Sequence, residues 1–138
     1  MRKIVIPGAS RIDQYLPLVR PGDFVYVSAG VPDIDWAGIA AFPFLHHSCE
    51  SDFSAARCEE VFRRILRIGA KPVVMEIPEK SASECFEIVT RGMGESSRRN
   101  VLRWLGGTPE PIIGICRRQS RTVLSAARAL GIPVRRGC

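Results

Sequence analysis

Short apolar runs alternate with longer segments of helical period along this chain. The runs at 3–6, 24–27, 71–77, 111–116 and 133–135 lack the polar alternation of a half-exposed strand and predict five buried β-strands. Between them, apolar residues that recur every three or four positions predict helices over about 52–69, 81–89, 95–105 and 120–130. This alternation predicts an α/β fold, a Rossmann-like, doubly wound and mostly parallel five-stranded sheet, in one domain over residues 1–138.

Capping and breaking residues refine these boundaries. Ser81 with Glu84 forms the capping-box pattern at the start of one helix, and Ser120 is predicted to cap the helix that follows the 111–116 run. Gly69 and Gly131 are predicted helix stops. Residues 31–51 combine turn residues with proline-broken apolar stretches and predict a long loop, a feature that is often functional.

The residues that follow the predicted strands are the first candidates for a binding site. In doubly wound sheets, ligands bind beyond the carboxyl ends of the strands, where small residues admit a phosphate and arginines neutralise it. Turn geometry alone is the alternative reason for small residues there. The candidates are Gly8, Ala9, Ser10 and Arg11 after the first strand, Ser28 and Gly30 after the second, and Arg117, Ser120, Arg121 and Thr122 after the fourth. Neither the dinucleotide fingerprint GxGxxG nor the P-loop pattern is present in the sequence.

Four stretches of the chain resemble the SLOG superfamily, the Rossmann-like group that includes the DNA-processing SMF proteins and the LOG-type hydrolases. They are Lys3–Arg11, Asp23–Gly30, Arg98–Asn100 and Glu110–Val134. The resemblance implies binding of a nucleotide or a nucleotide-derived ligand, and it adds Arg99 and Asn100 to the candidate ligand-binding residues. The Pro-Gly-Gly-x-Gly-Thr pattern of the LOG hydrolases is absent, so the resemblance does not extend to their activity.

Charge is distributed unevenly along the chain. The net charge is +6, but residues 1–90 carry 10 Lys/Arg against 12 Asp/Glu, while residues 91–138 carry 10 Arg against 2 Glu. A nucleic-acid-binding module that uses this basic C-terminal third is therefore an alternative function. In the predicted fold, only the arginines at 98–99 and 117–121 reach the ligand end of the sheet, and those at 135–136 lie far from it. This division favours a compact phosphate site.

Carboxylates near the strand ends suggest a second alternative, an N-glycosyl hydrolase or transferase acting on a nucleoside or nucleotide. Asp33, Asp35 and Glu76 are the candidate catalytic residues, as general base or as acceptor for a sugar hydroxyl. Turn chemistry around Pro32 explains the two aspartates equally well, so the sequence leaves open whether the protein is an enzyme.

Cysteine and histidine usage favours a cytoplasmic protein with reduced thiols. Five cysteines at irregular spacing follow no secretory signal, and His46, His47, Cys49 and Cys58 lack the spacing of a metal site. We therefore predict no metal and no cofactor. A nucleophilic pair of Cys49 with either histidine is a further alternative.

The apolar residues of the 31–51 region suggest contacts beyond the core. Trp36, Phe42 and Phe44 could stack on a base or pack internally, and burial of Phe42, Phe44 and Leu45 against a second copy predicts a homo-oligomer. No apolar run reaches the roughly 18 residues of a membrane span, so no membrane partner is expected.

Overall fold

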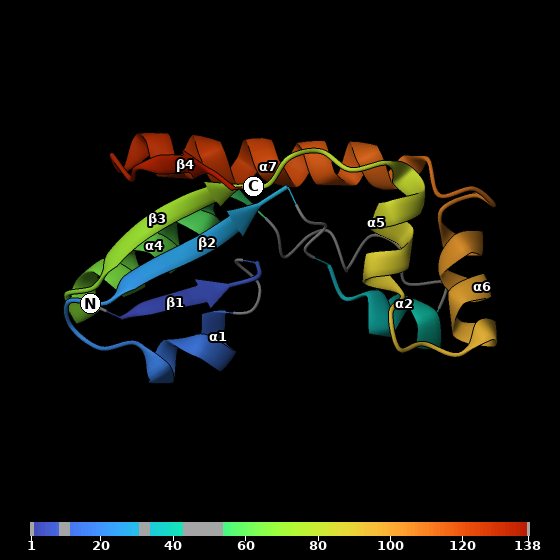
Figure 1. Ribbon diagram of the computed structural model, residues 1–138, viewed down its shortest axis with the longest axis horizontal. Coiled ribbons are helices and arrows are strands. Elements are labelled where there is room, and N and C mark those ends of the chain that lie inside the picture. Colours follow the sequence, from blue (N-terminus) through green and yellow to red (C-terminus); the bar gives the residue numbers. More distant parts are fainter. Residues whose placement is uncertain (1, 9–11, 31–33, 43–53, 138) are drawn as a thin grey trace.

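A parallel sheet forms the centre of the protein (Figure 1). The structure is a computed structural model that describes residues 2–8, 12–30, 34–42 and 54–137. The sheet has the order β1-β2-β3-β4, and every neighbouring pair is parallel. The α/β class and the parallel sheet are thus confirmed. The four strands are β1 (Lys3–Ile6), β2 (Phe24–Ala29), β3 (Lys71–Glu76) and β4 (Val134–Arg136).

The prediction of a fifth strand at 111–116 is wrong, because this segment is the first third of the long helix α7 (Pro111–Ala129). Pro111 occupies the first turn, where its fixed φ suits a helix and its missing N–H costs nothing. The buried residues of α7 keep the helical period without interruption, at 112, 115, 116, 119, 123, 126 and 127. Ser120 therefore lies inside the helix and does not cap one.

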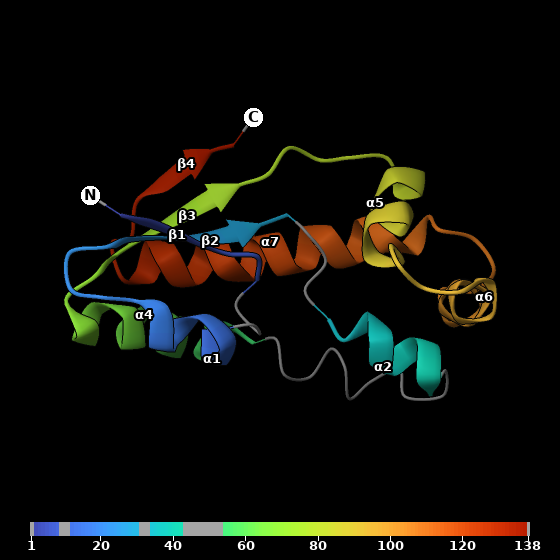
Figure 2. The same ribbon diagram turned by 60° about the horizontal axis from the view of Figure 1, so that its bottom comes forward.

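The helices that pack on the sheet lie on one of its faces. One core cluster joins buried residues of β1, β2 and β3 to α1 (Ile12–Tyr15), α4 (Ala55–Ile68) and the second half of α7, with Leu16 of the short helix η2 (Leu16–Leu18) against it. Figure 2 shows the sheet above these helices. Each connection between consecutive strands leads to the next strand in the same direction along the sheet. Connections of the same handedness therefore place their helices on the same face. The expectation of a doubly wound sheet is accordingly not confirmed.

A second core lies beyond the sheet. It joins α2 (Trp36–Ala41), α5 (Ala82–Val89) and α6 (Glu95–Trp104) to the first half of α7, which therefore belongs to both cores (Figure 1). The rings of Trp36 and Trp104 meet edge to face at 5.8 Å. Helix α2 lies within the segment 31–51, so the prediction of an uninterrupted loop there is wrong. Asp35 begins α2, because its Oδ1 accepts a hydrogen bond from the Gly38 N–H at 2.8 Å.

Local capping signals are confirmed at two helices. Ser81 Oγ accepts from the Glu84 N–H at 3.2 Å and donates to Glu84 Oε1 at 3.0 Å, so the predicted capping box starts α5. Helix α4 ends at Gly69, whose φ of 88° lies in the left-handed region.

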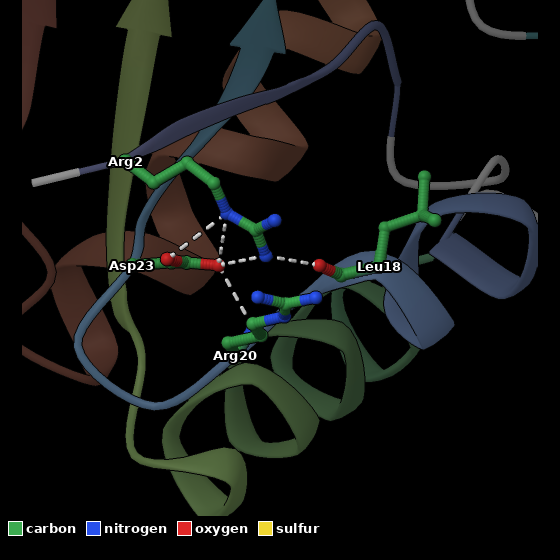
Figure 3. Close-up of polar contacts among 4 residues, drawn as sticks. All are labelled: Arg2, Leu18, Arg20 and Asp23. Carbon is green, nitrogen blue, oxygen red and sulfur yellow. Dashed lines mark hydrogen bonds and ion pairs between the residues drawn. The ribbon is translucent and has the colours of Figure 1, made fainter.

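The connection into β2 is fixed by a charged cluster at Asp23 (Figure 3). This carboxylate is buried, and it accepts hydrogen bonds from Arg2 Nη2 at 2.8 Å and from the Arg20 N–H at 2.8 Å. Arg2 also donates to the Leu18 carbonyl oxygen. The hydrogen bond from Arg2 and then that from Arg20 lower the pKa of Asp23, against a smaller effect of burial.

Candidate functional site

A pocket of about 750 Å³ lies where the sheet ends and the second core begins. It is bounded by the carboxyl ends of β2, β3 and β4 on one side and by the middle of α7 on the other. The lining residues are Gly30, Glu76, Ile77, Pro78, Glu79, Cys116, Arg117, Ser120, Arg121, Leu124 and Arg136. Five of the predicted site residues, Gly30, Glu76, Arg117, Ser120 and Arg121, are therefore brought together here.

Helix α7 supplies one wall of this pocket through its periodicity. Arg117, Ser120, Arg121 and Leu124 follow the spacing i, i+3, i+4, i+7, which puts them on one face of a helix. Arg121 Nε donates to the Arg117 carbonyl oxygen at 3.4 Å. The sequence analysis selects Arg117, Ser120 and Arg121 as residues that follow a strand, whereas the structure groups them because they share a helical face.

Gly30 allows the sheet wall of the pocket to close. Its φ is 111°, and a Cβ built on it would lie 2.8 Å from the carbonyl oxygen of Ile77. The Ile77 N–H donates to the Ala29 oxygen at 2.8 Å, so the chains leaving β2 and β3 stay in contact beyond the strands. A side chain at position 30 would separate these two segments.

Arg117 forms the best-defined ion pair of the pocket, with Glu79. Its Nη2 and Nε donate to the two carboxylate oxygens of Glu79 at 2.8 and 3.2 Å, a two-pronged contact. The hydrogen bond from Arg117 to Glu79 raises the pKa of the guanidinium. Both side chains are half exposed, so water screens the pair and it contributes little to stability.

Arg121 and Arg136 carry the remaining positive charge of the pocket. Within the described residues, neither guanidinium forms an ion pair with a carboxylate. Arg136 ends β4 beside Glu76 of β3, with which it is in register. Arg121 and Arg136 therefore leave the pocket with positive charge beside the half-buried carboxylate of Glu76. This charge suits the binding of an anion.

Arg136 is missed by the sequence prediction, which puts residues 135–136 far from the ligand end. The structure corrects this, because β4 is parallel to β3 and its carboxyl end is the end that faces the pocket. The rule that selects the ends of the other strands would have found Arg136. The sequence prediction also misses Glu79, because this residue lies three residues past the end of β3. Only its ion pair with Arg117 connects it to the site.

Several predicted site residues lie elsewhere. Arg99 pairs with Glu95 on exposed α6, and Asn100 Nδ2 donates to the Ala40 carbonyl oxygen at 2.9 Å, so Asn100 joins α6 to α2. Thr122 Oγ1 donates to the Arg118 oxygen within α7. Asp35 is occupied as the α2 cap described above.

The end of β1 contributes nothing to the described pocket. Gly8 is buried after β1 and does not line it. Ser28 pairs in register with Met75, and the alternation along β2 directs it to the sheet face without helices. Ala9, Ser10, Arg11 and Asp33 lie outside the described residues.

The cysteine of the pocket is not a reactive thiol. Burial raises the pKa of Cys116 to about 12, and the neighbouring Cys85 and Glu79 add to the effect. A thiolate is the nucleophilic form of cysteine, so this raised pKa disfavours reaction of Cys116 at neutral pH. The side chains of Cys58, Cys85 and Cys116 are all buried.

Other predicted features fall outside the pocket or outside the described residues. Trp36 packs in the second core, while Phe42 is 61% exposed. Phe44, Leu45, His46, His47 and Cys49, which include the candidate nucleophilic pair, lie outside the described residues. In the part of the chain that the structure describes, no cluster of three metal-ligating side chains occurs, and no helix combines the length and the apolar character needed to cross a membrane.

Comparison with known proteins gives no further constraint: no protein-family model, no curated protein and no solved structure matches this chain. The class of protein that the structure defines is thus an α/β protein with a parallel sheet and an arginine-lined pocket at the strand ends.

Proposed function

We propose that the pocket binds a nucleotide or a related small molecule through its phosphate. The observation that carries this proposal is the convergence of three arginines, Arg117, Arg121 and Arg136, at the carboxyl ends of parallel strands. Phosphate prefers guanidinium groups, whose planar donors match two of its oxygens at once. Ligands of open α/β sheets bind at this end.

The rest of the pocket suits the remainder of a nucleotide. A volume of about 750 Å³ lies within the usual range for small-molecule sites. The carboxylates of Glu76 and Glu79 can accept hydrogen bonds from sugar hydroxyls, and Leu124 and Ile77 offer apolar contact to a base. A Rossmann-like relation to the SLOG group would agree with this ligand class.

Arg121 and Arg136 give the sharpest test. Thermal-shift and calorimetric titrations with inorganic phosphate, AMP, ADP, cyclic AMP and NAD should stabilise the protein for at least one nucleotide. Arg121→Gln and Arg136→Gln should each weaken that binding by about tenfold or more, the value of one charge-assisted hydrogen bond. Arg103→Gln, on the exposed last turn of α6, removes the same charge away from the pocket and should leave affinity unchanged. No stabilisation by any nucleotide, or equal losses in all three variants, would overturn the proposal.

A second candidate is cleavage of an N-glycosyl bond, and Glu76 favours it. This half-buried carboxylate lines the pocket beside Arg136, where it could act as a general base toward water. Incubation with NAD or nucleoside monophosphates should then release free base, and Glu76→Gln should abolish the release while the nucleotide still binds. Binding without any release of base assigns the pocket to binding alone.

A further inference from the structure

The face of the sheet opposite the helices is a second surface, separate from the pocket. Among the described residues no helix lies over it (Figure 2). The register groups its side chains into three rows across the strands, because aligned residues of parallel strands point the same way. The rows are Lys3–Phe24–Lys71, then Val5–Tyr26–Val73, and then Ser28–Met75–Arg135. We call these nine residues the open face.

Aromatic and basic groups dominate the open face. Phe24 and Tyr26 lie two residues apart on β2 and are both only half-buried. Lys71 Nζ lies 5.2 Å from the centre of the Phe24 ring, and Lys3 Nζ lies 5.6 Å from that of Tyr26. Lys3, Lys71 and Arg135 are exposed, and none of the nine residues is acidic.

The open face also retains apolar area that a parallel sheet ordinarily buries. All-parallel sheets nearly always have both faces covered. Here Val5 is 51% exposed at one edge, and the rings of Phe24 and Tyr26 are only half-buried. The face therefore has both an apolar surface that favours contact and a positive charge that selects the partner.

We infer that the open face binds single-stranded nucleic acid. Two rings two residues apart on one strand, about 6.6 Å along the backbone, can each stack on one of two successive bases. Phosphates that draw Lys3 and Lys71 aside would free the ring faces that these ammonium groups now cover. A duplex keeps its bases paired and offers no base faces for stacking, so the surface should prefer single strands.

A second copy of the chain fits this surface less well. A two-fold contact would bring the open face of one protomer against the same face of another. Lys3, Lys71 and Arg135 would then lie against the same open face of the partner, none of whose nine residues is acidic. The charge of an anionic strand is complementary, and the charge of a second copy is not.

Fluorescence anisotropy of the full chain with a labelled oligo-dT or oligo-U strand, and with a hairpin duplex, tests the inference. We expect the single strand to bind more tightly than the duplex. Tyr26→Leu keeps an apolar side chain but removes stacking, and should weaken single-strand binding by about fivefold or more. Lys3→Gln with Lys71→Gln should reduce the slope of log affinity against log salt by about 1.4, because each neutralised phosphate of a single strand accounts for about 0.7 of that slope.

Matched controls separate the open face from general basicity. Arg103→Gln with Arg128→Gln removes the same charge from exposed helical positions outside the open face and should change affinity much less. Arg121→Gln, a pocket variant, should also leave strand binding intact, so this inference can fail or hold independently of the proposed nucleotide site. Circular dichroism and thermal melts verify that every variant folds.

Three outcomes overturn the inference. The first is an absence of single-strand binding, and the second is an equal loss of affinity in the helical control. The third is a dimer, detected by light scattering, that Tyr26→Leu dissociates, because it would assign the open face to a second copy. The lysine double variant keeps the test valid if Tyr26→Leu does not fold, since both lysines are exposed and outside the core.

Discussion

Replacement of Gly30 by alanine tests how closely the ends of β2 and β3 approach one another. A non-glycine residue at a φ of 111° costs about 1–3 kcal/mol in backbone strain. The new Cβ would also lie 2.8 Å from the Ile77 oxygen, a contact with backbone that can be relieved only by moving the chain. Such overpacking costs a further 1–3 kcal/mol or so. We therefore expect Gly30→Ala to lower the free energy of unfolding by about 2–6 kcal/mol.

Gly107 provides a matched control for the cost of backbone strain. Its φ is 100°, close to that of Gly30, but a Cβ there would meet nothing within 4 Å. Gly107→Ala should therefore cost the strain alone, about 1–3 kcal/mol. The difference between the two variants, about 1–3 kcal/mol, measures the contact with Ile77.

Urea denaturation of the two variants, followed by far-ultraviolet circular dichroism, gives both free energies. Equal losses of stability in Gly30→Ala and Gly107→Ala would refute the close approach at Ile77. The pocket provides a second readout, because residues 77–79 line one of its walls and their displacement would change its shape. We expect Gly30→Ala to weaken the binding of any phosphate ligand, and Gly107→Ala to leave its affinity unchanged.

Three further changes test the charges and thiols. Asp23→Asn should destabilise the protein at neutral pH, and the curves of unfolding free energy against pH for the wild type and the variant should converge in acid. The folded-state pKa of Asp23 lies below the unfolded value near 4, so its contribution to stability is full above that value and is lost as pH falls through the folded pKa. Parallel curves down to about pH 2 would contradict this. Glu79→Gln removes the anionic partner of Arg117 and should tighten phosphate binding several-fold in calorimetry, whereas weaker binding would mean that Glu79 itself holds the ligand. Cys116 should resist iodoacetamide at pH 7.5 in the folded chain and react in urea, and rapid alkylation of the folded protein would disprove its burial.

Local signals in the sequence predict most elements, since they act between neighbours. Ser81 with Glu84 and the stop at Gly69 need no tertiary information, and both occur as predicted. The segment 111–116 fails for a different reason. Three isoleucines and a cysteine within six residues look alike in a buried strand and in a buried helix, so periodicity over so short a run cannot separate them. Only the continuation of the buried positions to Ala127 reveals the helix.

The candidate site contains residues that the sequence selects correctly although it assigns them to the wrong secondary-structure element. The sequence selects Arg117 and Arg121 as part of a turn beyond a strand, and they line the pocket as neighbours one helical turn apart. Arg136 obeys the same rule as the other strand ends, but its selection requires the last strand to be parallel to its neighbours, which no local signal encodes. Asn100 is selected by resemblance, but its amide is used in a contact with Ala40, 60 residues away in sequence.

Strand order connects the two proposed surfaces. Because β1 to β4 follow one another in sequence, crossovers of one hand place the described helices that pack on the sheet on one of its faces. A doubly wound order would have covered Phe24 and Tyr26 with a helix and left no aromatic surface. The same order leaves α7 beside the covered face, where Arg117 and Arg121 near the middle of the helix reach the strand ends. The pocket and the open face thus both follow from one strand order but are separate surfaces. A substitution in one of them should therefore leave binding at the other unchanged.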